Sequence, residues 1–418
     1  MEVITKNRFP QRPDKIGGGD RAIDALVQRM GMQQFPDLGV DVPELSAEEL
    51  NRRLDGGERV TLLDTRRPAD FEAWHISHPN VTSVNVPFTA FLDAHGDPAE
   101  TVPDGVPDEP LVTCCAKGIS SLYVAAFLAR EGWDVVGLED GMEGWASLLE
   151  ALPVTAGVAD DAEIVQFHRP SSGCLSYLLV AGGDAAVVDP LDAFAAQYVG
   201  AADERGATLR YAVDTHVHAD HVSGVRAVAE ASDATAVMPQ GATDRGLAFD
   251  AELVEAGEAL PLGEQSIEAV ALPGHTTEML GYRFGGALVS GDTLFLDGVA
   301  RPDLEDAAAA REAAGTLWET LQALASEPAD LVVAPGHVGP TTVPGEDGSF
   351  TARLGELRER LRAFEEDREA FVERLLDDLP PRPANYERII AINLGQGSAS
   401  ATEAFELELG PNNCAVSE

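Results

Sequence analysis

The sequence predicts an α/β protein of two domains, and three observations lead to this prediction. A chain of 418 residues is long for a single hydrophobic core, so two domains are the natural expectation. In residues 43–154, short apolar runs alternate with helix-like stretches, which is typical of a small domain with a parallel sheet. In residues 163–395, β runs become more frequent than helices, which predicts a larger, sheet-rich second domain.

The elements of the first domain are expected in the following order. Buried strands are predicted at 61–64 and 111–113, because both runs are apolar, and a helix is predicted at 120–131. Residues 1–42 form an extension punctuated by proline and glycine, and we assign it no function. Residues 155–162 are polar and are expected to be a linker.

The second domain is expected to contain seven strands and four helices. The strands are predicted at 163–168, 175–180, 185–189, 210–215, 267–273, 287–292 and 331–336. The helices are predicted at 192–205, 222–232, 305–325 and 353–378. Residues 396–418 are expected to be a polar tail.

The formal net charge of −42 is extreme for a chain of this length. The acidic residues are spread along the whole chain, which favours adaptation to a high-salt cytoplasm over an acidic interaction tail. Such a protein is expected to unfold at low salt, where the repulsion between its charges is unscreened. It should also repel nucleic acid and anionic membranes, so neither is expected as a partner.

The four cysteines, Cys114, Cys115, Cys174 and Cys414, have no spacing typical of a disulfide framework. The charged amino terminus does not look like a signal peptide, and no apolar run approaches membrane-spanning length. We therefore expect a cytoplasmic protein with reduced thiols. Cys174 is interpreted as a residue of the core or near the mouth of the site and Cys414 as incidental, and the sequence gives no indication of the oligomeric state.

A dense run of metal-ligand side chains follows the strand predicted at 210–215. It reads T-H-x-H-x-D-H and contains His216, His218, Asp220 and His221. Imidazole and carboxylate groups are the ligands that a catalytic metal needs. The run therefore predicts a metal site at this strand end.

Three further ligand candidates, His275, Asp292 and His337, each follow a β run in the same way. A glycine precedes each of them, which is consistent with tight turns or a close backbone approach. Since chain segments that leave one edge of a sheet converge there, the four segments are expected to meet at one metal site.

These motifs resemble the metallo-β-lactamase superfamily over about residues 160–395. The resemblance implies an αββα sandwich with the metal site at one edge of its sheets. Segments 291–295 (GDTLF), 301–304 (RPDL) and 380–386 (PPRPANY) look most like the persulfide dioxygenase branch, with glyoxalase II its nearest relative.

The two branches imply different roles for the same residues. The dioxygenase branch implies one Fe(II) per chain, held by His216, His275 and Asp292, with open positions for sulfur and O2. The remaining candidates, His218, Asp220, His221 and His337, would then orient the ligands, with Asp220 also a catalytic candidate. Glyoxalase II implies instead two metal ions, such as Zn²⁺, at all seven positions for thioester hydrolysis. The ligand set alone does not choose between these readings.

A second candidate site follows the strand predicted at 111–113. Cys115, Lys117, Gly118 and Ser121 lie where this strand ends and the next helix begins. Backbone N–H groups and the dipole at a helix start stabilise a thiolate, and Lys117 adds a positive charge. We therefore predict that Cys115 is a nucleophile that acts on anionic sulfur donors, whereas Cys114 is expected to be buried.

This loop, together with segments 63–66 (LDTR), 85–87 (NVP) and 138–142 (LEDGM), resembles the rhodanese family over about residues 43–154. The resemblance implies that the Cys115 thiolate attacks a sulfane sulfur and forms an enzyme persulfide. Ala116 stands where arginine is common in the family, so a preference for thiosulfate does not follow.

The two resemblances together predict a dioxygenase that converts a small-thiol persulfide to sulfite, coupled to sulfur transfer at Cys115. Arg301 is expected to hold a carboxylate of the thiol carrier. One alternative is a zinc-dependent hydroxyacylthioester hydrolase with an accessory rhodanese domain, and another is a sulfur-relay protein. The sulfane-sulfur loop on the same chain favours the dioxygenase.

Overall fold

A parallel sheet forms the first domain of the computed structural model, which describes residues 38–92, 98–159, 161–410 and 414–417. Its strands are β1 (Glu44–Leu45), β2 (Val60–Asp64), β3 (Val81–Asn85), β4 (Leu111–Cys114) and β5 (Val135–Leu138). They pair in the order β1-β5-β4-β2-β3, and every pair is parallel, as predicted. Because both faces of such a sheet are covered, Leu62 and Leu63 are both fully buried although they point to opposite faces.

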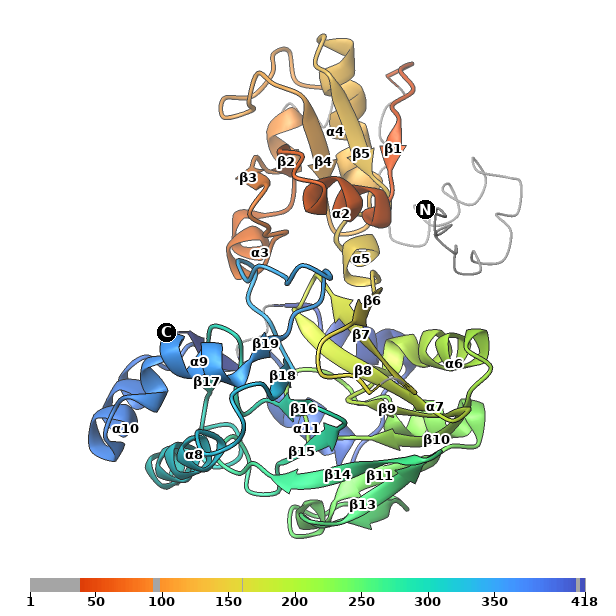
Figure 1. Cartoon of the computed structure of the whole chain (residues 1–418). Coiled ribbons are helices and arrows are strands. Elements are labelled where there is room, and N and C mark those ends of the chain that lie inside the picture. Colours follow the sequence, from red (N-terminus) through yellow and green to blue (C-terminus); the bar gives the residue numbers. More distant parts are fainter. Residues whose placement is uncertain (1–37, 93–97, 160, 411–413, 418) are drawn as a thin grey trace.

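Short helices surround this sheet (Figure 1). They are α2 (Ala47–Asp55), α3 (Pro68–Ala73), α4 (Ile119–Arg130), α5 (Gly141–Ala146) and the 3-10 turn η1 (Phe88–Phe91). Helix α2 begins after Ser46, whose side chain accepts a hydrogen bond from the Glu49 amide at 3.2 Å. Helix α4 matches the predicted helix and begins directly after the Cys115 loop.

Two sheets pack face to face in the second domain. The first contains β6 (Glu150–Val154), β7 (Ala162–Arg169), β8 (Cys174–Ala181), β9 (Asp184–Val188), β10 (Thr208–Val213), β11 (Thr235–Pro239) and β12 (Glu252–Val254). The second contains β13 (Ala259–Leu262), β14 (Gln265–Ala271), β15 (Leu280–Phe284), β16 (Ala287–Gly291), β18 (Val332–Pro335) and β19 (Ala352–Arg353). Buried residues such as Tyr177 and Val213 from the first sheet and Tyr282 and Val289 from the second share one core.

Helices cover the outer sides of both sheets (Figure 1). The helices are α6 (Ala195–Glu204), α7 (Val225–Ser232), α8 (Ala310–Leu324), α9 (Leu354–Arg360), α10 (Arg368–Asp377), α11 (Tyr386–Asn393) and α12 (Ala401–Leu407). Helices α6 and α7 pack on the first sheet through residues such as Tyr198 and Val228. Helix α8 packs against α10 beside the second sheet. The layers form the αββα sandwich that the resemblance implied.

Several predicted elements differ from the structure. The single helix expected at 353–378 is broken at Leu361, whose backbone is extended (φ −92°, ψ 125°) while its side chain stays buried. Helix α10 then starts afresh after its N-cap, Asp367. The helix expected from residue 305 begins only at Ala310, because Glu305 instead binds the backbone and hydroxyl of Thr277.

The two ends of the second domain also differ from the expected pattern. Strand β6 lies within the segment assigned to the first domain but pairs with β7 in the second domain's sheet. The expected polar tail contains helix α12 and strand β20 (Ala415–Ser417), which pairs with β17 (Gly298–Ala300). Among the residues that the structure describes, no helix is both long enough and apolar enough to cross a membrane.

Candidate metal centre and sulfur-transfer loop

The metal-ligand candidates lie just beyond the ends of four strands. The T-H-x-H-x-D-H run follows β10, and the other three candidates, His275, Asp292 and His337, follow β14, β16 and β18. All of their side chains are buried. Gly336 illustrates the need for glycine here, because a Cβ at that position would lie 2.5 Å from Asp292 Oδ1.

Three ligand atoms converge in this region without a hydrogen-bond partner. They are His216 Nε2, His275 Nε2 and Asp292 Oδ2, and all three are buried. The carboxylate oxygen lies 3.9 Å from His216 Nε2 and 3.8 Å from His275 Nε2. Buried polar atoms without partners are rare in folded proteins, and these three fit a shared metal ion.

The other atoms of these side chains are held in place by the surrounding structure. His275 Nδ1 donates to the Arg301 carbonyl at 2.8 Å. His216 Nδ1 lies 2.9 Å from the hydroxyl of Thr215, which itself donates to Asp189. In this arrangement Nδ1 of each ring carries the proton, so each Nε2 presents a lone pair to the metal position.

Burial and neighbouring side chains together set the protonation of this triad. Burial lowers the pKa of His275, and burial together with the nearby His218 and His275 rings holds the pKa of His216 well below its ordinary value. Burial alone would raise the pKa of Asp292, but the charge and hydrogen bond of His337 outweigh it and lower the pKa. Neutral imidazoles and an ionised carboxylate are the forms that bind a metal.

The neighbouring candidates His337, Asp220 and His221 are linked to Asp292 by a chain of hydrogen bonds. His337 Nδ1 donates to Asp292 Oδ1 at 2.6 Å, and its Nε2 lies 3.0 Å from Asp220 Oδ2. His221 Nδ1 also lies 3.0 Å from Asp220 Oδ2. Burial opposes protonation of the two imidazoles, yet the carboxylates beside them raise the pKa of both His337 and His221 well above the ordinary value.

His218 belongs to a separate group. Its Nε2 lies 3.2 Å from Asp189 Oδ1 and 3.5 Å from Asp214 Oδ1. Although burial and His221 oppose protonation, these carboxylates raise the pKa of His218 to about 9. The ring thus lies with its Nε2 between two aspartates, while its Nδ1 is buried without a hydrogen-bond partner among the residues that the structure describes.

The sulfur-transfer loop surrounds a buried thiol. The Cys115 side chain is buried, and Ser121 Oγ donates to its Sγ at 3.3 Å. Gly118 precedes helix α4 with φ +77°, and a Cβ there would lie 2.9 Å from the Asp140 amide, so the tight loop requires glycine. The start of α4 thus brings a hydroxyl donor to the thiol.

Lys117 and Cys114 take different positions beside this loop. The Lys117 ammonium pairs with Glu143 at 2.9 Å, and this hydrogen bond raises the pKa of the lysine. The expected positive charge next to Cys115 is thus partly neutralised by Glu143. Cys114 is fully buried, as expected, and burial raises the pKa of its thiol.

Comparisons with known proteins agree with these two sites. Residues 170–337 match the model of the metallo-beta-lactamase superfamily, and residues 46–148 match that of the rhodanese-like domain. A hydroxyacylglutathione hydrolase of Methylococcus capsulatus is 31% identical over 241 residues, which span 55% of this chain and 84% of that protein. The chain belongs to the metallo-beta-lactamase superfamily.

Two other proteins are also similar to this chain, one in sequence and one in structure. A hydroxyacylglutathione hydrolase of Anaeromyxobacter dehalogenans is 41% identical over 123 residues, 29% of this chain, and the match spans only about half (47%) of that relative. A metallo-beta-lactamase structure from Staphylococcus aureus is 26% identical, covers 56% of this chain and 73% of its own, and has a TM-score of 0.51. The superfamily comprises metal-dependent enzymes, which agrees with the buried His/Asp groups.

Arg301 of this metallo-β-lactamase domain does not match its expected role. Its side chain is 1% exposed, and Nε and Nη2 donate to the two oxygens of Asp303 at 2.8 and 3.1 Å. Its Nη1 donates to the Pro381 carbonyl at 2.9 Å. The guanidinium is therefore engaged within the protein, and Arg301 supports the site by presenting its carbonyl to His275.

Two cysteines lie at the metal centre, Cys174, which was expected in the core or near the site mouth, and Cys414, which was interpreted as incidental. Cys174 Sγ donates to Asp220 Oδ2 at 3.5 Å, and this thiol groups with Asp220, His221 and His337. Burial would raise the pKa of Cys174, but the charge of His337 lowers it to about 7. Cys414 is 1% exposed and groups with Asp220 and Asp292. No local sequence signal marks either residue, because long-range strand pairing brings both to the site.

A cleft of about 920 Å³ lies between the two domains and reaches the metal centre at His337. Trp74 and His75 of the rhodanese-like domain line one side, and Phe295 and Phe350 of the metallo-β-lactamase domain line the other. Its size is that of a typical small-molecule site.

Proposed function

We propose that this chain is a persulfide dioxygenase, which oxidises a small-thiol persulfide to sulfite and free thiol. One Fe(II) per chain would be held by His216, His275 and Asp292, and Cys115 would act as a coupled sulfurtransferase. The observation that carries the proposal is the convergence of three buried ligand atoms without hydrogen-bond partners in the described part of the chain, His216 Nε2, His275 Nε2 and Asp292 Oδ2, within 4.8 Å of one another.

The neighbouring residues use their ring nitrogens differently from the triad. His337 binds a carboxylate through each ring nitrogen, whereas His221 and His218 bind carboxylates through one nitrogen and leave His221 Nε2 and His218 Nδ1 without a partner among the described residues. When bound, Fe(II) on such a two-His-one-carboxylate face supplies open positions at which a persulfide and O2 can meet. The residues of the chain contribute the orientation, since Thr215 and the Arg301 carbonyl fix the two imidazoles.

The sulfur-transfer step takes place at Cys115. Its thiolate attacks the outer sulfur of a persulfide donor, the donor's S–S bond breaks, and a new S–S bond forms on Cys115. The donor leaves as a thiolate and takes up a proton, so no external oxidant is needed. Ser121 Oγ and the amides at the start of α4 stabilise the charge on sulfur.

The substrate carrier fits the interdomain cleft, which is large enough for a small thiol compound. The cleft reaches His337, whose other ring nitrogen binds the triad's Asp292. We expect the reactive sulfur to enter at this end and the carrier to lie between Trp74 and Phe295.

A thioester hydrolase with two zinc ions is the second candidate, and a specific observation favours it. The Methylococcus capsulatus relative is named a hydroxyacylglutathione hydrolase. Asp220, His221 and His337 also bring their ligand atoms together within 4.8 Å, which would suit a second ion.

Metal analysis combined with O2 uptake separates the two candidates. The protein would be purified in molar KCl and supplied with glutathione persulfide or with S-lactoylglutathione. One iron per chain, O2 consumption and sulfite release would support the dioxygenase. Two zinc ions with thioester cleavage and no O2 uptake would contradict it, and sulfur transfer by Cys115 without any metal turnover would indicate a relay protein instead.

A further inference from the structure

All four cysteines of the chain lie at one of the two candidate sites. Cys114 ends strand β4 of the rhodanese-like domain and Cys115 follows it, whereas Cys174 and Cys414 lie at the metal centre. The proposed function uses only Cys115, which leaves the thiols at the metal centre without a role. Cys174 is the better placed, because it begins β8 beside a cavity.

The turn at residues 169–174, between β7 and β8, connects the two sites. Arg169 Nε donates to the Ala146 carbonyl of helix α5 at 2.9 Å, and Trp74 Nε1 donates to the Ser171 carbonyl at 3.1 Å. At the other end of the turn, Cys174 contacts Asp220 of the metal centre. The same six residues therefore contact the rhodanese-like domain and the metal centre.

The conformation of this turn is fixed by close backbone packing and by backbone hydrogen bonds. Gly173 has φ +73°, and a Cβ there would lie 2.1 Å from the Val338 carbonyl. Backbone hydrogen bonds from Val338 to Gly173 (2.9 Å) and from Leu175 to Gly336 (2.8 Å) lock the turn against the strand end that carries His337. Cys174 is thus held rigidly at the metal centre.

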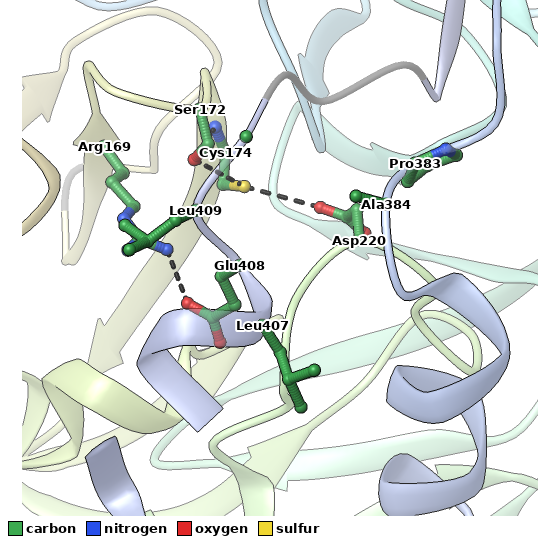
Figure 2. Close-up of a pocket in the computed structure, with 10 residues that line it drawn as sticks. Arg169, Ser172, Cys174, Asp220, Pro383, Ala384, Leu407, Glu408 and Leu409 are labelled. Atoms are coloured by element: carbon green, nitrogen blue, oxygen red, sulfur yellow. Dashed lines mark hydrogen bonds and ion pairs between the residues drawn. The ribbon is translucent and has the colours of Figure 1, made fainter. Parts of the chain in front are cut away.

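A small cavity opens beside the Cys174 thiol (Figure 2). Its volume of about 10 Å³ has room for a single small atom or water molecule. Arg169, Ser172, Cys174 and Asp220 line it together with residues 407–410 of the carboxyl-terminal segment. Ser172 Oγ donates to Cys174 Sγ at 3.0 Å, so a hydroxyl already faces this sulfur.

Arg169 supplies an unused donor to the cavity. Its side chain is 1% exposed, Nε binds Ala146, and Nη1 binds Glu408 at 2.6 Å. Its Nη2 has no hydrogen-bond partner among the described residues. A buried donor without an acceptor costs about 1–3 kcal/mol, so an acceptor atom in this cavity within reach of Nη2 would be favoured.

We propose that Cys174 accepts a sulfane sulfur and carries it as a persulfide, whose terminal sulfur occupies this cavity beside Arg169. The terminal sulfur of a persulfide is a compact acceptor with anionic character, which matches a single-atom space next to a guanidinium and a hydroxyl. The donor is a persulfide or polysulfide, either free or formed on Cys115.

The transfer balances without an added oxidant. Cys174 Sγ attacks the outer sulfur of the donor, the donor's S–S bond breaks, and a new S–S bond forms on Cys174. The donor sulfur keeps the electron pair of the broken bond and receives the Cys174 proton. The inference rests on the proposed function only in that it takes persulfides to be what the chain encounters.

Mass spectrometry on the full chain tests the proposal under anaerobic conditions, so that oxygen-dependent turnover cannot remove the sulfur. The purified protein would be treated with sodium tetrasulfide in molar KCl, alkylated and digested. We expect the Cys174 peptide to gain the mass of one sulfur atom. Cys114, which is fully buried and lines neither cavity described here, serves as the internal control and should remain unmodified.

Two variants sharpen the test. Arg169→Met removes the free donor and should lower the Cys174 persulfide occupancy roughly tenfold, the effect of losing one hydrogen bond to a charged group. Because that change also leaves Glu408 buried without its partner, Ser172→Ala provides a milder variant, in which the persulfide should be reduced several-fold faster by added thiol.

The outcomes separate this proposal from the proposed function. A Cys174 that stays free of sulfur while Cys115 gains it would overturn the proposal, and so would unchanged Cys174 occupancy in both folded variants. Sulfur on Cys174 without O2 uptake would contradict only the dioxygenase. O2 uptake with an unmodified Cys174 would contradict only the proposal that Cys174 carries a persulfide.

Discussion

Two neighbouring groups of histidine and aspartate at the sheet edge differ in what their ligand atoms contact. In the triad of His216, His275 and Asp292, three buried atoms have no partner and point to one position. In the group around Asp220, the imidazoles of His221 and His337 are bound to the carboxylate. Residue type and spacing are alike in the two groups, but each triad member leaves a ligand atom without a partner among the described residues, whereas in the second group His337 binds through both ring nitrogens and only His221 Nε2 is a histidine nitrogen without one.

The largest effect is expected from removing a triad ligand. Asp292→Ala deletes the one carboxylate between the two free imidazoles, so we expect loss of bound iron and of O2 uptake. Elemental analysis and oxygen-electrode measurements check this. Sulfur transfer by Cys115 provides the control for folding and should be unchanged. A variant that keeps its full iron content would contradict the assignment of Asp292 as a metal ligand.

Loss of the Cys115 thiol should remove the other activity completely. Cys115→Ser leaves a poor nucleophile at the start of α4, so transfer of sulfane sulfur to cyanide should fall to background. Iron content should stay at the wild-type level, because no Cys115 contact with the triad exists among the described residues. Cys114→Ser is the matched control and should retain transfer.

A smaller effect is expected at His337, which contacts the triad without belonging to it. His337→Ala removes the 2.6 Å hydrogen bond to Asp292, and such a loss lowers metal affinity about 10- to 100-fold. Chelator competition would measure the change. His221→Ala is the control, because its Nδ1 binds Asp220, which does not belong to the triad, and it should have the weaker effect. Loss of one of two bound metal ions in both variants would favour the dinuclear hydrolase.

The smallest loss of iron is expected at His218. His218→Ala should retain most of the iron but reduce turnover, because Asp189 then loses one of the partners that help it hold Thr215 and, through it, His216. The iron content of this variant, measured beside that of His275→Ala, shows whether His218 is a direct ligand. Equal iron loss in the two variants would make His218 a direct ligand.

The sequence was informative wherever the signal was local. Each ligand candidate directly follows an apolar β run, so the strands and the positions of His275, Asp292 and His337 could be read from short windows. The partner of a buried polar group, in contrast, depends on contacts between distant segments. Arg301 is occupied by Asp303 and by Pro381, which lies 80 residues away, and no periodicity predicts that choice.

The same dependence on contacts between distant segments explains why the sequence did not predict the positions of the two cysteines or the break in the helix. Cys414 reaches the metal centre because β20 pairs with β17, and Cys174 because its turn is fixed against Val338. Leu361 keeps the apolar spacing of a continuous helix, yet its backbone is extended, because burial in the core determines its conformation. Tertiary packing decided each of these cases.

The buried ion pair between Arg169 and Glu408 has a consequence for how the protein melts. Glu408 also accepts a hydrogen bond from the Val222 amide, next to the T-H-x-H-x-D-H run, while Arg169 binds Ala146 of the other domain. Both charges of the pair belong to the second domain, so the first domain meets this buried ion pair through the hydrogen bond from Arg169 to Ala146. Glu408→Gln would leave the Arg169 charge buried without its partner, at a cost of about 3–5 kcal/mol, and calorimetry should show a lower melting temperature for the second domain.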